Sequence, residues 1–371
     1  MNNINGYKLS PAQQSILMAE QYYEGKPVNN ICFIVNFPDA DIVCLTEAVN
    51  DFIEHTQSLR MVVRDMNVAL EKAEQYICEY EYEDIPVYSF AERNEEYDEF
   101  LKTELTRIID IEKKMYRFYI ITLSDGSADI IAVVHHLSAD GFACGEATKA
   151  ITANYRSILE GKEPTAKFDD YTDYLLNSEA VYEKSYERNK KFWNSYLEKP
   201  FSPAKLTDTD TSDIWAKRTI YYLTDKEKDI LDKLTKLSHQ TVVTVLMSLY
   251  GLYFLKTGDS DRIAMGSPFL NRTNAGERKI FGLFATMLPF IFDIEECSNF
   301  IELCNVTGSR TISLLRHQRF SYTEIQSISE KNHGLSEKLY NVMFNYIPLD
   351  LNSLGLVDWL HNGTSEYELC I

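Results

Sequence analysis

The sequence predicts a mixed α/β (α+β) fold in two lobes, residues 1–163 and residues 164–371. Segments with helical periodicity alternate along the chain with short β-branched apolar runs, and there is no internal repeat or low-complexity tract. The 371 residues, 45% hydrophobic and 25% charged, have the composition of a globular protein with two or three compact units. The polar Gly/Pro break at residues 161–165 marks the boundary that we expect between the lobes.

The first lobe opens with a helix, because Ser10-Pro11 combines an N-cap residue with proline at the first helical position. The apolar run Ile31–Phe37 is typical of a buried strand. A second helix is expected where apolar residues recur at i, i+3, i+4, i+7 and i+8, namely Leu45, Ala48, Val49, Phe52 and Ile53. The remaining expected elements are the strands Leu59–Arg64, Tyr76–Tyr82, Met115–Leu123 and Asp129–His135 and the helix Phe142–Glu160.

In the second lobe, the nearly all-apolar segment Thr241–Leu255 predicts a core helix. Polar residues over Leu206–Asp213 predict a loop. Two more helices are expected over Tyr171–Leu176 and Ala180–Leu197. The expected strands are Arg218–Leu223, Arg262–Met265, Met287–Asp293, Leu339–Tyr346 and Tyr367–Ile371.

The charge balance limits the classes of partner. Lys and Arg number 37 against 56 Asp and Glu, which gives a net charge of −19. Nucleic-acid binders require basic patches that replace counterions, and anionic membranes attract basic segments, so we expect neither nucleic acid nor membrane as a partner. The N-terminal residues contain no apolar signal core, and Thr241–Leu255 is too short to span a bilayer. We therefore expect a cytoplasmic protein.

The cysteines predict neither a disulfide framework nor a zinc site. Their number is odd, no two are spaced as C-x-x-C, and most lie among apolar neighbours, as is typical of small buried fillers. The seven are Cys32, Cys44, Cys78, Cys144, Cys297, Cys304 and Cys370.

The most informative segment is Asp129-Ile-Ile-Ala-Val-Val-His135-His136-Leu-Ser-Ala-Asp140-Gly141. A β-branched strand ends in two adjacent histidines, and a turn with Asp and Gly precedes the next helix. Because successive strand residues point to opposite faces, one histidine can face a cleft while the other packs behind it. A histidine held at a rigid strand end suits proton transfer near neutral pH.

Other interpretations of this segment remain open. A histidine beside an apolar strand is commonly structural. A metal site is disfavoured because adjacent strand histidines point apart and no third ligand is near in sequence. Ser138 or Cys144 is a further alternative as a nucleophile, the latter because the first turn of a helix stabilises a thiolate.

The segment resembles the H-H-x-x-x-D-G signature of the condensation domains of nonribosomal peptide synthetases, which belong to the chloramphenicol-acetyltransferase-like acyltransferases. Further blocks match in order and rough spacing over essentially the whole chain. These blocks are Ser10-Pro-Ala-Gln13, His55-Thr-Gln-Ser-Leu59-Arg60, Tyr171-Thr-Asp173-Tyr174, Gly266-Ser-Pro268 to Arg272, Gly282-Leu-Phe284-Ala-Thr-Met-Leu288-Pro289, His317 to Tyr322, and Val342 to Tyr346.

The resemblance implies two chloramphenicol-acetyltransferase-like lobes with a cleft or tunnel between them. It implies peptide-bond formation between an acyl or peptidyl thioester and the amine of an aminoacyl thioester. No cofactor is expected to bind directly: the phosphopantetheine arms of donor and acceptor carrier proteins bring the substrates. The resemblance further implies an adjacent adenylation domain, and we expect a monomer.

The resemblance also assigns roles to individual residues. His136 is the expected catalytic residue, either as general base or by holding the amine and stabilising the tetrahedral intermediate. His135 and Asp140 are expected to be architectural, with Asp140 paired to Arg60. Gly141 is expected to let substrate or backbone pass close by.

Several positions depart from the family pattern. His55 stands where the family has Arg, and Thr286 and Met287 replace its usual Asn-Thr pair. The chain is also short for the family, which predicts a truncated second lobe. Other functions stay open: an acyltransferase of the same fold with a soluble or coenzyme-A-linked substrate, an epimerisation domain, and a non-catalytic domain that recruits a carrier or other partner.

Overall fold

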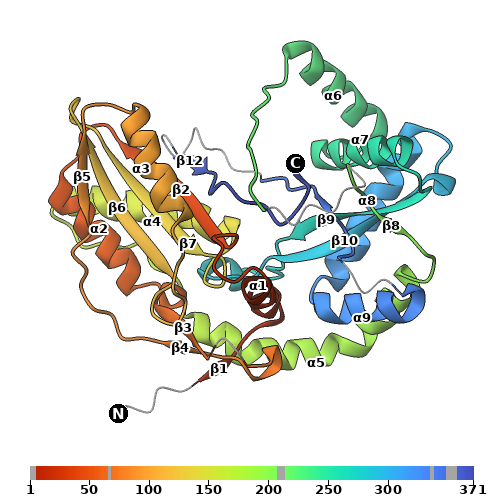
Figure 1. The fold of residues 1–371 in the computed structure, drawn as a ribbon, viewed down its shortest axis with the longest axis horizontal. Coiled ribbons are helices and arrows are strands. Elements are labelled where there is room, and N and C mark those ends of the chain that lie inside the picture. Colours follow the sequence, from red (N-terminus) through yellow and green to blue (C-terminus); the bar gives the residue numbers. More distant parts are fainter. Residues whose placement is uncertain (1–5, 66–67, 207–213, 335–337, 348–356) are drawn as a thin grey trace. The chain divides into compact units, whose positions relative to one another are not determined.

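The computed structural model describes residues 6–65, 68–206, 214–334, 338–347 and 357–371 (Figure 1). The chain forms two compact units. Unit 1 comprises Met1–Val181, Arg272–Phe284 and Ile347–Thr364, and unit 2 comprises Tyr182–Asn271, Ala285–Tyr346 and Ser365–Ile371. Unit 1 thus continues beyond residue 163 and includes two segments from the later part of the chain.

Unit 1 contains a five-stranded sheet of order β12-β2-β7-β6-β5. The antiparallel core of this sheet aligns Asn30 of β2 with His135 of β7. A smaller sheet has the order β1-β4-β3. The strands are β1 (Tyr7–Lys8), β2 (Asn30–Phe37), β3 (Met61–Arg64), β4 (Glu74–Ile77), β5 (Val87–Phe90), β6 (Tyr116–Leu123), β7 (Ala128–His135) and β12 (Val357–Leu360).

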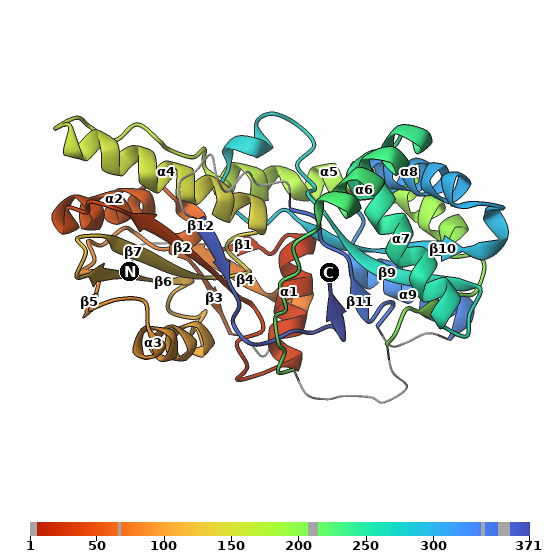
Figure 2. The same cartoon turned by 90° about the horizontal axis from the view of Figure 1, so that it is seen from above.

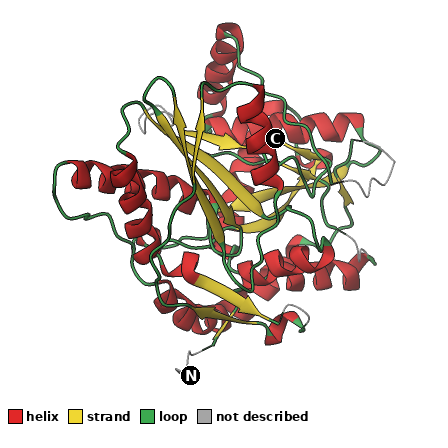
Figure 3. Ribbon diagram, turned by 60° about the vertical axis from the view of Figure 1, so that its left-hand side comes forward, coloured by secondary structure: helices red, strands yellow, loops and turns green. Residues whose placement is uncertain are grey.

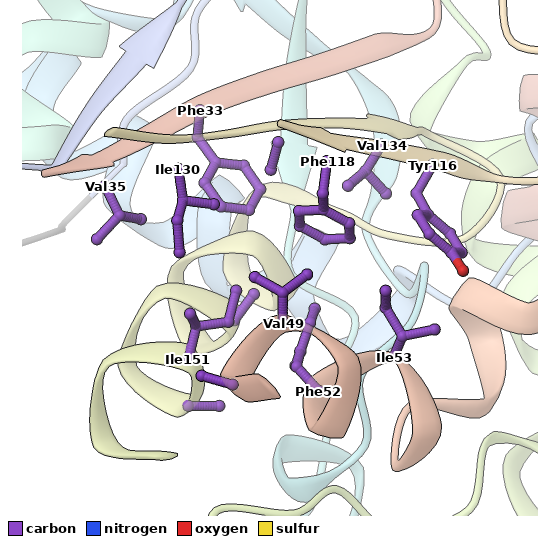
Figure 4. Packing of buried hydrophobic residues seen from close by; sticks show 14 of the residues in the cluster. Phe33, Val35, Val49, Phe52, Ile53, Tyr116, Phe118, Ile130, Val134 and Ile151 are labelled. Atoms are coloured by element: carbon purple, nitrogen blue, oxygen red, sulfur yellow. The ribbon is translucent and has the colours of Figure 1, made fainter. Parts of the chain in front are cut away.

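Helices cover both faces of the five-stranded sheet. Figure 2 shows α2 (Ile42–Glu54) and α4 (Gly141–Leu159) on one face and α3 (Glu95–Thr106) on the other. Because side chains alternate along a strand, Phe33 packs in the α2/α4 cluster while Cys32 joins the α3 cluster. Figure 4 shows the first cluster, in which residues such as Phe52 of α2 lie against the strands. Each fully buried side chain of this size contributes about 1.5–3 kcal/mol.

Unit 2 contains a sheet of order β10-β9-β11-β13, with β8 beside β9. Figure 3 shows the helices of the chain in red and the strands in yellow. Gly266 of β9 lets the Tyr340 ring pack directly on the backbone, because an added Cβ would lie 2.5 Å from that ring. The elements are β8 (Ser202–Pro203), β9 (Arg262–Phe269), β10 (Thr286–Asp293), β11 (Val342–Met343), β13 (Leu369–Cys370), α6 (Asp225–Ser238), α7 (Val242–Thr257), α8 (Phe300–His317) and α9 (Tyr322–His333).

Several elements expected from the sequence are confirmed. Helix α1 (Pro11–Tyr22) begins with a capping box, in which Ser10 and Gln13 bond each other's backbone N–H. The expected helices in α2, α4 and α7 and the expected strands in β2, β6, β7 and β10 form with small shifts at their ends, and β9 begins at the expected Arg262 but continues to Phe269.

The two helices expected over Tyr171–Leu176 and Ala180–Leu197 form one helix instead, α5 (Tyr171–Tyr196). The intervening residues contain neither Gly nor Pro. Asn177 donates its side-chain amide to the carbonyl of Asp173 at 2.6 Å, and the Ser178 hydroxyl donates to the carbonyl of Leu175 at 2.8 Å. Both side chains are thus satisfied within the helix, so nothing ends it there.

Some expected strands are wrong. Arg218–Leu223 forms no strand, and among the described residues no strand pairs with it, so side chains such as Tyr222 are exposed. Leu59–Arg64 begins as a 3₁₀ turn, Gln57–Arg60, before β3. The strand expected over Tyr76–Tyr82 ends at Ile77, and the one over Leu339–Tyr346 is only β11. Residues 207–213 of the expected loop lie outside the described residues.

Candidate active site

The two histidines lie at the end of β7, a strand buried along its whole length. Neighbouring backbone fixes them: the N–H of His135 donates to the carbonyl of Met115 at 2.7 Å, and the N–H of His136 donates to the carbonyl of Asn29 at 2.8 Å. The turn after His136 leads directly into α4, whose N-cap is Asp140. The strand end therefore holds both rings on a rigid support.

His135 points into a buried polar network. Its Nδ1 accepts the N–H of Leu137 at 3.2 Å, so the neutral ring carries its proton on Nε2, which lies 3.1 Å from Oε2 of Glu20. Asn29 also donates to that oxygen, at 2.7 Å. Burial alone would raise the pKa of Glu20, but the hydrogen bonds from His135 and Asn29 outweigh it and lower that pKa. This geometry suits a structural role for His135.

His136 is different, because its ring is only partly buried while its Nδ1 is sealed from solvent. Among the described residues, no group makes a well-aligned hydrogen bond to that nitrogen, although backbone groups of His136 and Ala139 lie close to the ring. Burial lowers the pKa of His136, and the nearby Asp140 carboxylate only partly offsets this. The lowered pKa favours the neutral ring at pH 7, and because Nδ1 is enclosed, Nε2 is the nitrogen that remains for a ligand.

Asp140 joins the start of α4 to a segment that returns from later in the chain. Its Oδ1 accepts the N–H of Ala143 at 2.9 Å, and its Oδ2 accepts the N–H of Phe284 at 3.0 Å. Nη2 of Arg272 lies 3.4 Å from Oδ1. Asp140 and Arg272 are both buried within unit 1.

Arg272 holds the returning segment Arg272–Phe284 together. Its guanidinium donates to the carbonyls of Glu277, Ile280 and Gly282 at 2.5, 2.8 and 2.9 Å. The same group lies over the ring of Phe284, with 3.9 Å between the guanidinium carbon and the ring centroid. One cation thus orders the segment that donates to Asp140.

The expected pair between Asp140 and Arg60 is wrong, because the ion pair of Asp140 is with Arg272. Nη1 of Arg60 instead donates to the carbonyl of Cys78 at 2.5 Å. Arg272 belongs to one of the blocks that carried the family resemblance. Asp140 and Arg272 are 132 positions apart in sequence, so no local pattern indicates this pairing.

Gly141, the first residue of α4, does not have a left-handed backbone, and an added Cβ would meet no heavy atom of the described residues within 4 Å. The expectation that backbone passes close by is therefore wrong. The space at the start of α4 is open, so the expectation that a substrate passes close to Gly141 stays a prediction.

Gln13 is a supporting residue whose role the sequence reasoning missed. Its fully buried side chain donates through Nε2 to the carbonyl of Leu137 at 3.1 Å and to Oε1 of Gln75 at 2.9 Å. The Leu137 carbonyl lies in the turn directly after His136. The only signal was that Gln13 belongs to the Ser10-Pro-Ala-Gln13 block.

Ser138 and Cys144 lack the geometry of activated nucleophiles. The Ser138 hydroxyl is buried and donates to the carbonyl of His135 at 3.0 Å rather than to a histidine ring. Burial and, to a smaller extent, the Asp140 charge raise the pKa of the Cys144 thiol well above its usual range. A protonated, buried thiol is inert.

Comparison with known proteins identifies the family. The Condensation domain family matches residues 3–359. Surfactin synthase subunit 1 of Bacillus subtilis (strain 168) is 24% identical over 355 residues, which cover 92% of this chain and 10% of that subunit. Surfactin synthase subunit 2 is 23% identical over 98% of this chain and 10% of its own length. The chain therefore spans about a tenth of the length of these curated relatives.

The fold is also that of solved condensation domains. The starter condensation domain of rhizomide synthetase, in complex with C8-CoA, superposes with a TM-score of 0.84 at 19% identity, covering 98% of this chain and 85% of that one. The first condensation domain of the CDA synthetase superposes with a TM-score of 0.82 at 15% identity, and the match covers 97% of this chain and 86% of that one. The expected mixed α/β, chloramphenicol-acetyltransferase-like fold is confirmed.

Within the described residues, every helix is too short or too polar to cross a membrane. The family match covers almost the whole chain, including both histidines, Asp140 and the returning segment with Arg272. The chain belongs to the condensation domains of nonribosomal peptide synthetases.

Proposed function

We propose that this condensation domain forms an amide bond between two substrates tethered to the phosphopantetheine arms of donor and acceptor carrier proteins. The amine of an aminoacyl thioester attacks the carbonyl carbon of an acyl or peptidyl thioester. The C–N bond forms, the tetrahedral intermediate expels the donor arm as a thiolate, and the proton lost by the amine balances that charge. The two lobes, residues 1–163 and 164–371, and an adjacent adenylation domain are part of the same proposal.

The observation that carries the proposal is the partly exposed ring of His136 at the end of β7, which encloses Nδ1 and leaves Nε2 to meet a substrate. A neutral imidazole on a rigid strand end is a ready hydrogen-bond partner for the amine or for the intermediate. An α-amino group has a pKa of about 8, and burial lowers the pKa of His136 below 6.5. Proton transfer from ammonium to this ring is therefore unfavourable, which supports positioning of the amine over general-base catalysis.

The supporting residues then have distinct roles in the proposal. His135 with Glu20 holds the strand end, Asp140 with Arg272 holds the turn, and Gly141 leaves open space at the start of α4. Arg60 supports the neighbouring segment through Cys78 rather than through Asp140.

The test is a single-turnover assay with loaded donor and acceptor carriers and detection of the amide product by mass spectrometry. We expect His136→Gln to remove product while the circular dichroism spectrum and unfolding midpoint stay unchanged. His55→Gln is the matched control, since His55 lies in unit 1 and bonds Asp51 and Lys167. Carrier binding without amide product in the wild type would favour a recruitment domain instead, and product from a coenzyme-A thioester alone would favour a soluble-substrate acyltransferase.

A further inference from the structure

Unit 2 carries a basic surface on a chain whose net charge is −19. Three exposed cations from two helices combine there with two exposed apolar residues. We call this surface the α5–α8 face, and it consists of Arg188, Lys191, Ile312, Leu315 and Arg316.

The two helices are fixed against each other at this surface. The ring of His317, at the end of α8, stacks on the ring of Phe192 in α5, with 4.0 Å between centroids and 5° between planes. Nδ1 of His317 lies 2.9 Å from Oδ1 of Asn189, and Nε1 of Trp193 donates to the His317 carbonyl at 3.3 Å. Arg188 and Arg316 each lie one residue from this junction, on their respective helices, so the α5–α8 face is preformed.

The cations of the α5–α8 face are not neutralised. Among the described residues, none of Arg188, Lys191 and Arg316 has a carboxylate within ion-pair distance, although Glu187 lies four positions before Lys191. Burial lowers the pKa of His317, and the charges of Arg188 and Arg316 lower it further. The local potential is therefore positive although the chain as a whole is strongly acidic.

The apolar part of the face lies beside these cations. Ile312 and Leu315 are 52% and 44% exposed. Ile312 precedes Arg316 by one helical turn, and Leu315 follows Ile312 at i+3, so the three side chains share one stripe of α8. An apolar centre with a charged rim is typical of a protein interface.

We propose that the α5–α8 face docks the acidic surface of one carrier protein, with a small apolar side chain of the carrier on Ile312 and Leu315 and its carboxylates on Arg188, Lys191 and Arg316. This inference rests on the proposed function, which supplies the carrier as partner. Because the chain repels acidic proteins overall, a local cationic face is required to give such a partner a favourable encounter. Salt weakens the attraction between this face and an acidic carrier, since the Debye length is about 8 Å at physiological ionic strength.

The test compares two charge-reversal variants of equal charge, R188E/R316E on the α5–α8 face and K233E/K236E on the exposed surface of α6. The substrates are a loaded carrier protein and, separately, the same acyl group on N-acetylcysteamine, which needs no docking. We expect R188E/R316E to raise KM for the loaded carrier about tenfold and to remove its salt dependence. We expect K233E/K236E to change KM by less than about twofold, and neither variant to change turnover of the small thioester.

An equal rise in KM for both variants would show a whole-chain charge effect and would overturn the proposal, as would an unchanged KM in R188E/R316E. Fluorescence anisotropy of the labelled carrier separates this result from failure of the proposed function. Binding that R188E/R316E weakens, without any amide product, supports the α5–α8 face and contradicts the catalytic proposal.

Discussion

The Asp140 carboxylate accepts the backbone N–H of Phe284 at 3.0 Å, although Phe284 lies 144 residues further along the chain. The other oxygen of Asp140 caps α4, and both oxygens face the guanidinium of Arg272. A single side chain thus starts the helix that follows His136 and holds the returning segment against it. The turn that carries His136 is therefore closed by tertiary contacts as well as by local sequence.

Asp140→Ala should destabilise unit 1 by about 3–5 kcal/mol, because it leaves the buried Arg272 without its counter-charge. Asp41→Ala is the matched control: Asp41 caps α2 through an equivalent bond of 2.9 Å to Cys44, but it is exposed. Loss of that cap alone should cost about 1 kcal/mol. Urea unfolding of both variants measures the difference, and equal losses would mean that capping alone explains Asp140.

Gly141→Ala should fold normally and change stability by less than about 0.5 kcal/mol, because the new methyl group meets no atom. Its kcat/KM should fall if substrate uses the open space at the start of α4. Gly266→Ala provides the contrast, since its Cβ would lie 2.5 Å from the Tyr340 ring, and overpacking typically costs about 1–3 kcal/mol. Thermal unfolding and amide formation are measured together, and full activity in Gly141→Ala would contradict the predicted substrate passage.

Acid should affect His136 only below pH 6.5, because its pKa is lowered in the folded protein. In the unfolded chain the ring takes its proton near pH 6.5, so folding stability falls as the pH drops from there through the lower folded pKa. An NMR titration should locate the His136 pKa below 6.5, and His136→Gln should remove that part of the pH dependence of stability. A ring that titrates at or above 6.5 would contradict this and would reopen the general-base role.

Gln13→Ala should cost about 1–3 kcal/mol, because it leaves the buried Leu137 carbonyl and the Gln75 amide without their partner. Activity should fall with it, since Leu137 directly follows His136. Gln14→Ala is the neighbouring control, with one partly buried bond to the Leu9 carbonyl. Chemical denaturation together with the amide assay tests the pair, and indistinguishable variants would remove Gln13 from the supporting residues.

The elements predicted correctly have strong local signals. The apolar spacing of α2 and the β-branched residues of β2 and β7 reflect the faces that these elements bury. Helix α3 went unnoticed, although Tyr97, Leu101 and Leu105 recur on its buried face, because the helix is rich in acidic residues. Arg218–Leu223 has strand-forming residues but pairs with no strand in the part of the chain that the structure describes, and only tertiary pairing decides such a case.

The candidate site was predictable only in part. The histidine motif and its turn are contiguous in sequence, so their position at the end of β7 followed from local pattern. The partner of Asp140 did not follow from local pattern, because both Arg60 and Arg272 lie in segments that match family blocks. Only the path of residues 272–284, which return to unit 1, brings Arg272 to Asp140. The neutral state of His136 depends on burial, which the sequence does not encode locally.

The late segments of unit 1 constrain how the chain folds during synthesis. Until Arg272 and Leu360 have been translated, Asp140 lacks its counter-charge and the outer edge of β2 lacks β12. A fragment that stops at residue 163 or at Val181 would therefore leave an unpaired strand edge, which invites aggregation. Expression of the histidine-bearing fragment Met1–Val181 by itself should fail for this reason. A circular permutant that joins Arg272–Phe284 and Ile347–Thr364 to this fragment would contain every segment of unit 1.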